Sequence, residues 1–207
     1  MTNKIIHQVN QYYSKKIIEN GATAQGVDWN STESQELRFE VLSNVINADE
    51  NFSVLDYGCG FGSMYDYFKK KYFQFHFTGL DISEEMIREA VKRNAGNKNS
   101  AWITTLNANA LFDYVIASGI FNVKLNNSNK EWETYMKEII HKINTHAKKG
   151  FSFNVLTQYS DKEFMKDYLY YADPLFLFDY CKKHFSRNVA LLHDYNLYEF
   201  TIIVRRL

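Results

Sequence analysis

Apolar and polar positions follow two different periods along this chain. From about residue 52 onward, stretches with one period alternate with stretches that have the other. Short apolar runs are typical of buried strands, and apolar residues repeated three or four positions apart are typical of helices with one buried face. The strand-like runs are 52–57, 75–80, 102–106, 112–118 and 151–156, and the helix-like stretches are 62–72, 83–96, 130–146 and 174–184. Gly150 is expected to end the long helix 130–146. The alternation predicts an α/β protein with a largely parallel sheet.

The end of the chain departs from this alternation. Two more strand-like runs, 189–193 and 198–205, are separated only by residues 194–197. That gap is long enough for a hairpin and too short for the helical crossover that joins parallel strands. We therefore expect a three-layer sandwich around a seven-stranded, mostly parallel sheet whose last strand is antiparallel.

The first fifty residues predict helices rather than strands, at 3–20 and 31–46. We interpret residues 1–50 as an N-terminal helical cap on a sheet-containing domain, 51–207. No linker rich in proline or serine separates the two parts, so we expect one structural domain overall.

The strand 52–57 leads into a turn rich in glycine, VLDYGCGFG. Gly58, Gly60 and Gly62 permit a tight turn and let a ligand approach bare backbone. Phosphate-binding loops share this property, so the glycines alone are weak evidence. The spacing G-x-G-x-G is more specific, and so is Asp56, which lies in the strand just before the turn. A carboxylate at that point is unfavourable for a pyrophosphate and favourable for the ammonium of an amino acid.

Asp81 supplies a second carboxylate. It follows the strand 75–80 and lies 19 residues beyond Gly62, where an acidic side chain can accept hydrogen bonds from the hydroxyls of a ribose. A ligand with an ammonium, a ribose and no phosphate is S-adenosylmethionine. The alternative is a nicotinamide dinucleotide bound by a turn of the same kind.

The stretches VLDYGCGFG, TGLDIS and FDYVIASGIFN together resemble the class I S-adenosylmethionine-dependent methyltransferases, over roughly residues 52–207. The resemblance implies a Rossmann-like methyltransferase fold, in which the last strand is antiparallel, and S-adenosylmethionine as the cofactor. It also implies site residues: Gly58, Cys59 and Gly60 against the methionine part, Asp81 at the ribose, Ile82 on the adenine, and Ser118, Gly119 and Ile120 beside the cofactor and the transferred methyl.

The resemblance does not identify the residues that contact two parts of the cofactor, its adenine and its carboxylate. Many family members carry an acidic residue after the third strand that binds the adenine amino group, but residues 102–107 read WITTLN, with no carboxylate before Asp113. We expect Thr105 or Asn107 to bind the adenine through a neutral hydrogen bond instead. Arg38 either pairs with the carboxylate of the cofactor or makes a surface salt bridge.

The acceptor is expected beyond the carboxyl ends of the strands, where open α/β sheets bind their ligands. The polar and aromatic insertion 157–171 is a candidate wall, and Asp28 and Trp29 are candidates to close over the site. Methyl transfer from a sulfonium depends mainly on alignment and exclusion of water. If the acceptor needs a general base, His193 is the candidate, with Tyr195 beside it; the alternative is a structural histidine at a strand end.

The composition of the chain limits the kinds of partner that we expect. Lysine plus arginine and aspartate plus glutamate each number 24, and a neutral chain disfavours DNA or large RNA as the main partner. Cys59 and Cys181 match no metal-ligand spacing, so no metal site is expected. No apolar run approaches the roughly 18 residues of a membrane span, and the start of the chain lacks a secretory signal, which together favour the cytoplasm.

The function that we expect is S-adenosylmethionine-dependent methyl transfer, by direct displacement, to a small or medium-sized acceptor. Two alternatives stay open. One is a non-catalytic domain of the same fold that binds the cofactor or a partner. The other, less favoured, is an NAD-dependent oxidoreductase.

Overall fold

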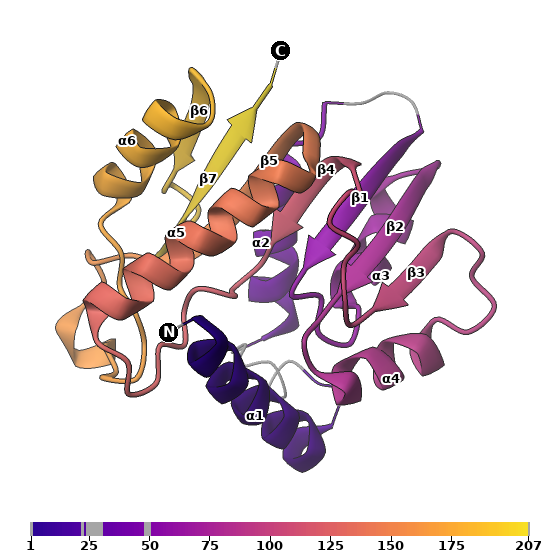
Figure 1. Cartoon of the computed structure of the whole chain (residues 1–207), viewed down its shortest axis with the longest axis horizontal. Coiled ribbons are helices and arrows are strands. Elements are labelled where there is room, and N and C mark those ends of the chain that lie inside the picture. Colours follow the sequence, from indigo (N-terminus) through magenta and orange to yellow (C-terminus); the bar gives the residue numbers. More distant parts are fainter. Residues whose placement is uncertain (1, 22, 24–30, 48–50, 207) are drawn as a thin grey trace.

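The computed structural model describes residues 2–21, 23, 31–47 and 51–206. A seven-stranded sheet lies at its centre, with the strand order β3-β2-β1-β4-β5-β7-β6 (Figure 1). Its strands are β1 (Phe52–Tyr57), β2 (Phe75–Leu80), β3 (Ser100–Ile103), β4 (Phe112–Ala117), β5 (Ala147–Leu156), β6 (Asn188–Leu192) and β7 (Glu199–Arg205).

The pairing of the strands confirms the predicted topology. Neighbouring strands from β3 to β5 pair in parallel, and β7 pairs antiparallel with both β5 and β6. β7 is therefore the one strand of this sheet that runs against the others. The short connection from β6 to β7 requires this reversal because no helix can form in it.

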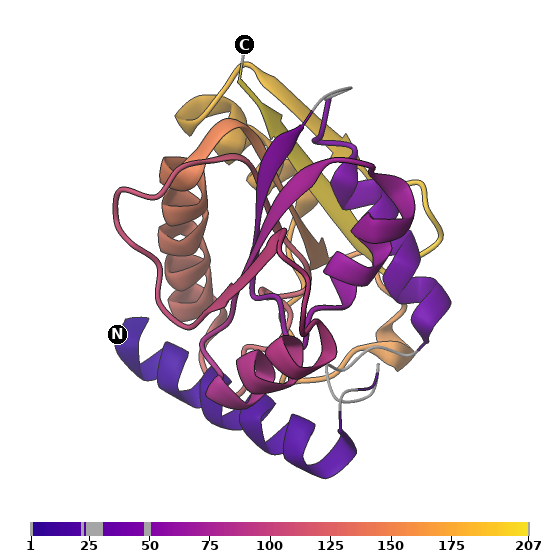
Figure 2. The same cartoon turned by 90° about the vertical axis from the view of Figure 1, so that its right-hand side faces the viewer.

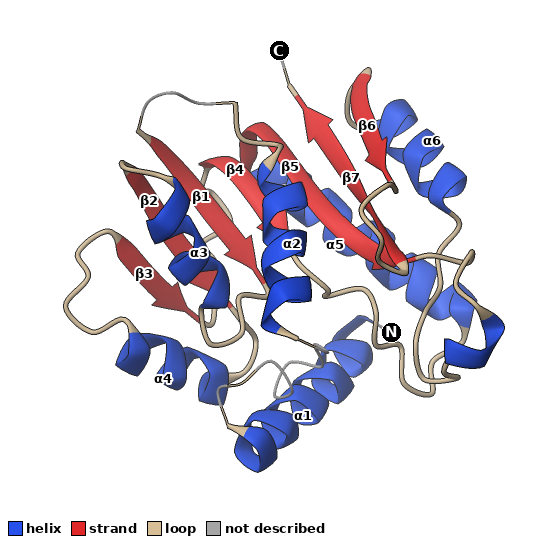
Figure 3. Cartoon of the chain, turned by 180° about the vertical axis from the view of Figure 1, so that it is seen from behind, coloured by secondary structure: helices blue, strands red, loops and turns tan. Residues whose placement is uncertain are grey.

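Helices lie on both faces of the sheet, as the alternation predicted. They are α1 (Thr2–Asn20), α2 (Thr32–Ser43), α3 (Ser63–Lys71), α4 (Glu84–Arg93), α5 (Asn129–His146) and α6 (Pro174–His184). Seen from behind, α2 and α3 cover the near face, whereas α5 and α6 cover the far face (Figure 3). Each face has its own apolar core: Leu42, Phe68 and Phe77 are buried under α2 and α3, and Trp132 and Phe151 under α5 and α6.

Side chains at the start of the helices fix where they begin. Ser83 accepts a hydrogen bond from the backbone N–H of Met86 at the start of α4. Ser128 and Glu131 form a reciprocal capping box at the start of α5. Asp173 caps α6, whose first residue is proline, a residue that suits the first helical position because its missing N–H would have no partner there.

The prediction that Gly150 ends the long helix is wrong. α5 ends at His146, β5 begins at Ala147, and Gly150 lies inside β5 opposite Arg205. A Cβ atom at this position would lie 2.6 Å from the carbonyl oxygen of Val204. Glycine is therefore present because the neighbouring strand approaches closely, and not because a helix ends there.

The insertion 157–171 contains little helix. Its one helical segment is the 3₁₀ turn η2 (Lys162–Phe164). Isolated bridges between Val123 and Leu169 and between Thr157 and Ala172 attach the insertion to the loop after β4 and to the end of β5. These bridges hold the aromatic insertion over the carboxyl end of the sheet.

The helix α1 lies across the same end of the sheet, next to α4 (Figures 1 and 2). Its Ile5 and Val9 belong to the core under α5, and its Ile17 packs with Phe61 and Met86. Among the described residues, no helix combines the length and the apolar character needed to cross a bilayer.

Candidate active site

The glycine turn after β1 has a backbone shape that favours glycine. Gly58, Gly60 and Gly62 have φ angles of 85°, 53° and 90°, which lie in the left-handed region. The N–H groups of Gly58 and Cys59 both donate to the carbonyl oxygen of Leu80, at 2.7 and 2.9 Å. The turn is thus attached to the end of β2, and its backbone borders the space beyond the sheet.

Gly58 is also restricted by its neighbour. A Cβ atom there would collide with Cγ2 of Ile120, in the loop after β4. The turn and this loop approach each other so closely that only bare backbone fits between them. The close approach of a ligand to this backbone, which the glycine spacing predicted, stays a prediction.

A cavity of about 1270 Å³ opens beside the turn. It extends from the carboxyl ends of β1, β2 and β4 to α1, α2 and the insertion. Ten of the predicted cofactor residues line it: Arg38, Asp56, Gly58, Cys59, Gly60, Asp81, Ile82, Ser118, Gly119 and Ile120. The fold therefore gathers residues from four separate parts of the sequence around one space.

Asp56 is the most buried carboxylate of the cavity wall, with 2% of its surface exposed. Its Oδ1 has no hydrogen-bond partner among the described residues. Loss of hydration on burial, together with the nearby charge of Asp81, raises the pKa of Asp56 to about 8. A buried acceptor atom without a partner indicates a cationic or hydrogen-donating ligand.

Asp81 holds the turn from the other side. Its carboxylate accepts hydrogen bonds from the backbone N–H of Gly60 and of Ser83, both at 2.9 Å. Burial raises the pKa of Asp81, while these two hydrogen bonds act in the opposite direction by stabilising its ionised form. The two predicted carboxylates, Asp56 and Asp81, therefore face the same space.

The loop after β4 forms the opposite wall. The N–H of Gly119 donates to Oδ1 of Asn154 at 2.7 Å, which fixes this loop to the neighbouring strand β5. Ser118 presents a buried hydroxyl that has no partner among the described residues. Ile120 then packs against the glycine turn, as described above.

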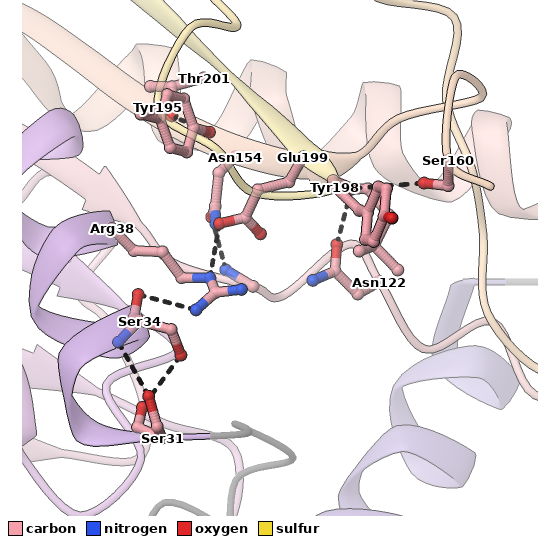
Figure 4. A network of polar contacts seen from close by, with 12 residues as sticks. Ser31, Ser34, Arg38, Asn122, Asn154, Ser160, Tyr195, Tyr198, Glu199 and Thr201 are labelled. Atoms are coloured by element: carbon pink, nitrogen blue, oxygen red, sulfur yellow. Dashed lines mark hydrogen bonds and ion pairs between the residues drawn. The ribbon is translucent and has the colours of Figure 1, made fainter. Parts of the chain in front are cut away.

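A buried ion pair joins α2 to β7 at the edge of the cavity. Nε of Arg38 lies 2.5 Å from Oε1 of Glu199, and Nη1 of Arg38 donates to the carbonyl oxygen of Ser34 (Figure 4). Burial raises the pKa of Glu199, whereas the charge of Arg38 lowers it. Arg38 is therefore no surface residue: its side chain is 10% exposed, and that of Glu199 is fully buried.

Five predicted site residues are not among those that line the cavity. Gly62 caps α3, and the side chain of Asn107 accepts the N–H of Asn109 in the loop after β3. Thr105 is exposed in the same loop. The ring of His193 packs near Tyr159 and Phe200, and the hydroxyl of Tyr195 is hydrogen-bonded to that of Thr201. The roles that we predicted for these side chains stay predictions. Asp28 and Trp29 lie outside the described residues.

The sequence pattern did not indicate that α1 forms a wall of the cavity. Val9, Tyr13, Lys16 and Asn20 line the cavity and lie three or four positions apart, on one face of the helix. The spacing was visible in the sequence. It could not reveal that this face covers a cavity as well as part of the core, because α1 reaches the site only through the tertiary fold.

The chain is similar in sequence to known methyltransferases. Residues 54–148 match the family model of a methyltransferase domain. The chain is 47% identical, over 162 residues, to the protein of Mycobacterium tuberculosis named "Putative methyltransferase Rv1506c"; the match covers 78% of this chain and 98% of that protein. The chain belongs to the class I S-adenosylmethionine-dependent methyltransferases.

Solved methyltransferase structures share the fold at low sequence identity. Magnesium protoporphyrin IX methyltransferase from Synechocystis PCC 6803, with bound SAH, superposes with a TM-score of 0.68 at 15% identity, covering 97% of this chain and 99% of that one. The N-methyltransferase NodS from Bradyrhizobium japonicum WM9 superposes with a TM-score of 0.64 at 12% identity, covering 95% and 97%. The Rossmann-like methyltransferase fold predicted from the sequence is confirmed.

The site of this methyltransferase fits its cofactor. S-adenosylmethionine carries an ammonium, a ribose with two hydroxyls and an adenine. The cavity offers the unpartnered Oδ1 of Asp56, the carboxylate of Asp81 and the bare backbone of the glycine turn. The cofactor, when bound, supplies the electrophilic methyl group on its sulfonium.

Proposed function

We propose that this methyltransferase transfers the methyl group directly to a small or medium-sized acceptor that enters the same cavity. The observation that carries the proposal is the continuity of the cavity, whose wall includes both the glycine turn and the aromatic insertion. Ligand sites measure roughly 300–1,000 Å³, so about 1270 Å³ leaves room for an acceptor beside the cofactor.

The proposed roles follow from the placement of each group. Asp56 binds the ammonium, since its unpartnered oxygen needs a donor. Asp81 binds the ribose hydroxyls, and Gly58 and Gly60 let the ligand approach the backbone. Ile82, at the end of β2 and 38% exposed, presents an apolar face for the adenine.

The rest of the cavity aligns the acceptor and excludes water. Displacement at a methyl carbon requires the nucleophile, carbon and sulfur to lie in line, and holding two reactants in that geometry can contribute roughly 7–11 kcal/mol to lowering the barrier. Tyr135, Val123 and Leu156 also line the cavity. Because His193 is not among the lining residues, we propose no role as a base for it.

The fold does not select the atom that receives the methyl group. One structural neighbour is described as an N-methyltransferase and another, CurJ, as a carbon methyltransferase. The acceptor must therefore be read from the side chains of this cavity.

Substitution of Asp81 tests the cofactor site. Asp81→Ala removes the proposed ribose acceptor and the hydrogen bond that shapes Gly60, so we expect S-adenosylmethionine to bind at least about tenfold more weakly. Asp66→Ala is the matched control, because Asp66 is a partly buried aspartate that pairs with Lys69 and Arg93 and does not line the cavity. Calorimetry with S-adenosylmethionine and SAH gives both affinities. Equal affinity in the Asp81 variant and the control would contradict the proposal.

A further inference from the structure

We propose that Asn122 and the ring pair of Phe164 and Tyr198 bind the acceptor, and that the acceptor is a planar compound carrying an oxygen atom that accepts a hydrogen bond. This inference rests on the proposed function and names the substrate class of the same site. It follows from the orientation of one buried amide, from the position of this amide along the cavity, and from two exposed rings.

The side chain of Asn122 lines the cavity in one fixed orientation. Its Oδ1 accepts the N–H of Leu156 at 3.2 Å, and because only the oxygen of an amide can accept, the amide nitrogen is turned toward the open space (Figure 4). The carbonyl oxygen of Asn122 accepts the N–H of Tyr170 at 2.8 Å, which holds the backbone as well. Asn122 is only 8% exposed. A buried donor held in this way is a specific contact for an oxygen atom of a ligand.

Asn122 lies between the glycine turn and Tyr198. Ile120, two residues before it, packs against the turn. On the other side, the N–H of Leu156 donates to the side chain of Asn122, and the N–H of the next residue, Thr157, donates to the carbonyl oxygen of Tyr198 at 3.0 Å. Figure 4 shows Asn122 and Tyr198 next to each other. An acceptor that binds this amide therefore has the turn on one side and Tyr198 on the other.

The rings of Phe164 and Tyr198 lie at the mouth of the cavity. Both line it, yet they are 57% and 45% exposed. Their centroids are 5.8 Å apart, with an interplanar angle of 35°. The hydroxyl of Tyr198 donates to Asp161, which fixes its ring in place. Exposed rings that are held beside a cavity are suited to a planar apolar body, which they can contact face to face or edge to face.

The ring pair favours a planar compound over a sugar. A sugar presents several hydroxyls, and hydroxyls that become buried need hydrogen-bond partners. Phe164 has no polar group in its side chain, and the hydroxyl hydrogen of Tyr198 is already donated to Asp161. The lining residues Val123 and Leu169, which pair through an isolated bridge, have apolar side chains. This part of the wall therefore offers apolar contact and few partners for hydroxyls.

Three naphthalenes test the contact with the amide of Asn122. The full chain, saturated with SAH, is equilibrated by dialysis with 2-naphthol, 2-acetylnaphthalene or naphthalene, and the bound fraction gives each affinity. The first two probes carry a hydroxyl and a carbonyl oxygen, and naphthalene carries no oxygen. We expect at least one of the two oxygen-bearing probes to bind at least about threefold more tightly than naphthalene. The tighter of the two shows whether the subsite takes a hydroxyl or a carbonyl.

Asn122→Asp should abolish this preference. Aspartate keeps an oxygen for the N–H of Leu156 and replaces the donating nitrogen with a second oxygen. Asn127→Asp is the matched control, because Asn127 belongs to the same loop, is 9% exposed and does not line the cavity. Binding of SAH to each variant shows that it is folded.

Phe164→Ala tests the ring pair. Loss of this ring should weaken the binding of all three probes by at least about threefold, because each has the same planar body. Tyr159→Ala is the control, because Tyr159 is an exposed aromatic residue of the same insertion that does not line the cavity.

Equal binding of the three probes, or binding of none of them, would overturn the inference. A preference that survives in Asn122→Asp, or that is also lost in Asn127→Asp, has the same meaning, as do equal effects of Phe164→Ala and Tyr159→Ala. Tighter binding of methyl β-glucoside than of the naphthalenes would show that the rings hold a sugar instead. If SAH still binds in those cases, the proposed methyltransferase function stands. If the unmodified chain does not bind SAH, the proposed function fails as well.

Discussion

At the scale of single residues, Asp56 combines a cost in stability with the role in cofactor binding that we propose for it. Its carboxylate is buried at the end of β1 with one oxygen unpartnered, and its pKa is raised to about 8 by burial and by the charge of Asp81. The unfolded chain releases this proton near the ordinary value of 3.8. Between these two values the folded protein holds a proton that the unfolded chain has lost, so the free energy of unfolding falls as the pH rises.

Asp56→Asn should therefore stabilise the protein without ligand and impair binding. Asparagine has nearly the same shape and stays neutral, which removes the cost of ionising a buried group. We expect little difference in stability from the unmodified chain near pH 4 and a gain on the order of 1–3 kcal/mol near pH 8. Urea unfolding across this pH range measures the gain, and calorimetry should show at least about tenfold weaker binding of S-adenosylmethionine. A gain that is the same at every pH would contradict the assignment.

At the scale of elements, the site depends on contacts between segments that are distant in sequence. The turn after β1 is shaped by Leu80 and Asp81 at the end of β2, and it packs against Ile120 after β4. The helix α2 is joined to β7 by Arg38 and Glu199. Each junction supports one wall of the cavity.

Gly58→Ala tests the first junction. The new Cβ would meet Ile120 at a backbone angle of 85°. Gly96→Ala is the control, because Gly96 has a similar φ of 87° and nothing within 4 Å of the added carbon. We expect both variants to lose about 1 kcal/mol from backbone strain, and only Gly58→Ala to lose a further 1–3 kcal/mol, roughly, from overpacking. Thermal unfolding of the two variants measures this difference. If they unfold alike, the close approach of Ile120 has no energetic consequence.

Removal of one partner tests the second junction. Arg38→Met would leave Glu199 fully buried without its cation, and we expect a loss of about 3–5 kcal/mol in the free energy of unfolding. The double variant Arg38→Met/Glu199→Gln should recover part of this loss. Lys70→Met removes the exposed ion pair between Lys70 of α3 and Glu36 of α2 and should cost less than about 1 kcal/mol. Urea unfolding of the unmodified chain and of the three variants measures these losses. Equal losses in Arg38→Met and Lys70→Met would contradict the burial argument.

At the scale of the whole molecule, the cavity is closed by parts that do not belong to the strand–helix repeat. The helix α1 crosses the carboxyl end of the sheet beside α4 (Figure 2). Ser14 of α1 is hydrogen-bonded there to Ser83 and Glu85. Residues of the insertion also line the cavity. The ends of the strands, α1 and the insertion therefore form its wall together.

Binding of SAH should protect α1 more than a helix that is remote from the cavity. A ligand at 100 times its Kd stabilises the bound state by about 2.7 kcal/mol. We expect amide hydrogen exchange in the part of α1 that includes Val9 and Tyr13 to slow by at least about tenfold. No residue of α6 lines the cavity, so its exchange should change much less. Equal protection of both helices would indicate global stabilisation rather than closure by α1.

The local patterns of this sequence determined the order and type of the elements. Apolar runs and helical spacing predicted the seven strands and six helices, and the short connection before the last strand determined its direction, because these features depend on residues close together in the chain. The glycine turn with Asp56, and Asp81 after the next strand, predicted the cofactor for the same reason.

Contacts between distant segments were decided only by the tertiary structure. Gly150 resembles a helix end, yet its place in β5 depends on the approach of Val204. The burial of Arg38 depends on Glu199, which lies far along the chain. The wall contributed by α1 arises where separate elements meet. Such contacts leave no local period in the sequence, because the sequence records which residues are adjacent in the chain and not which residues are adjacent in space.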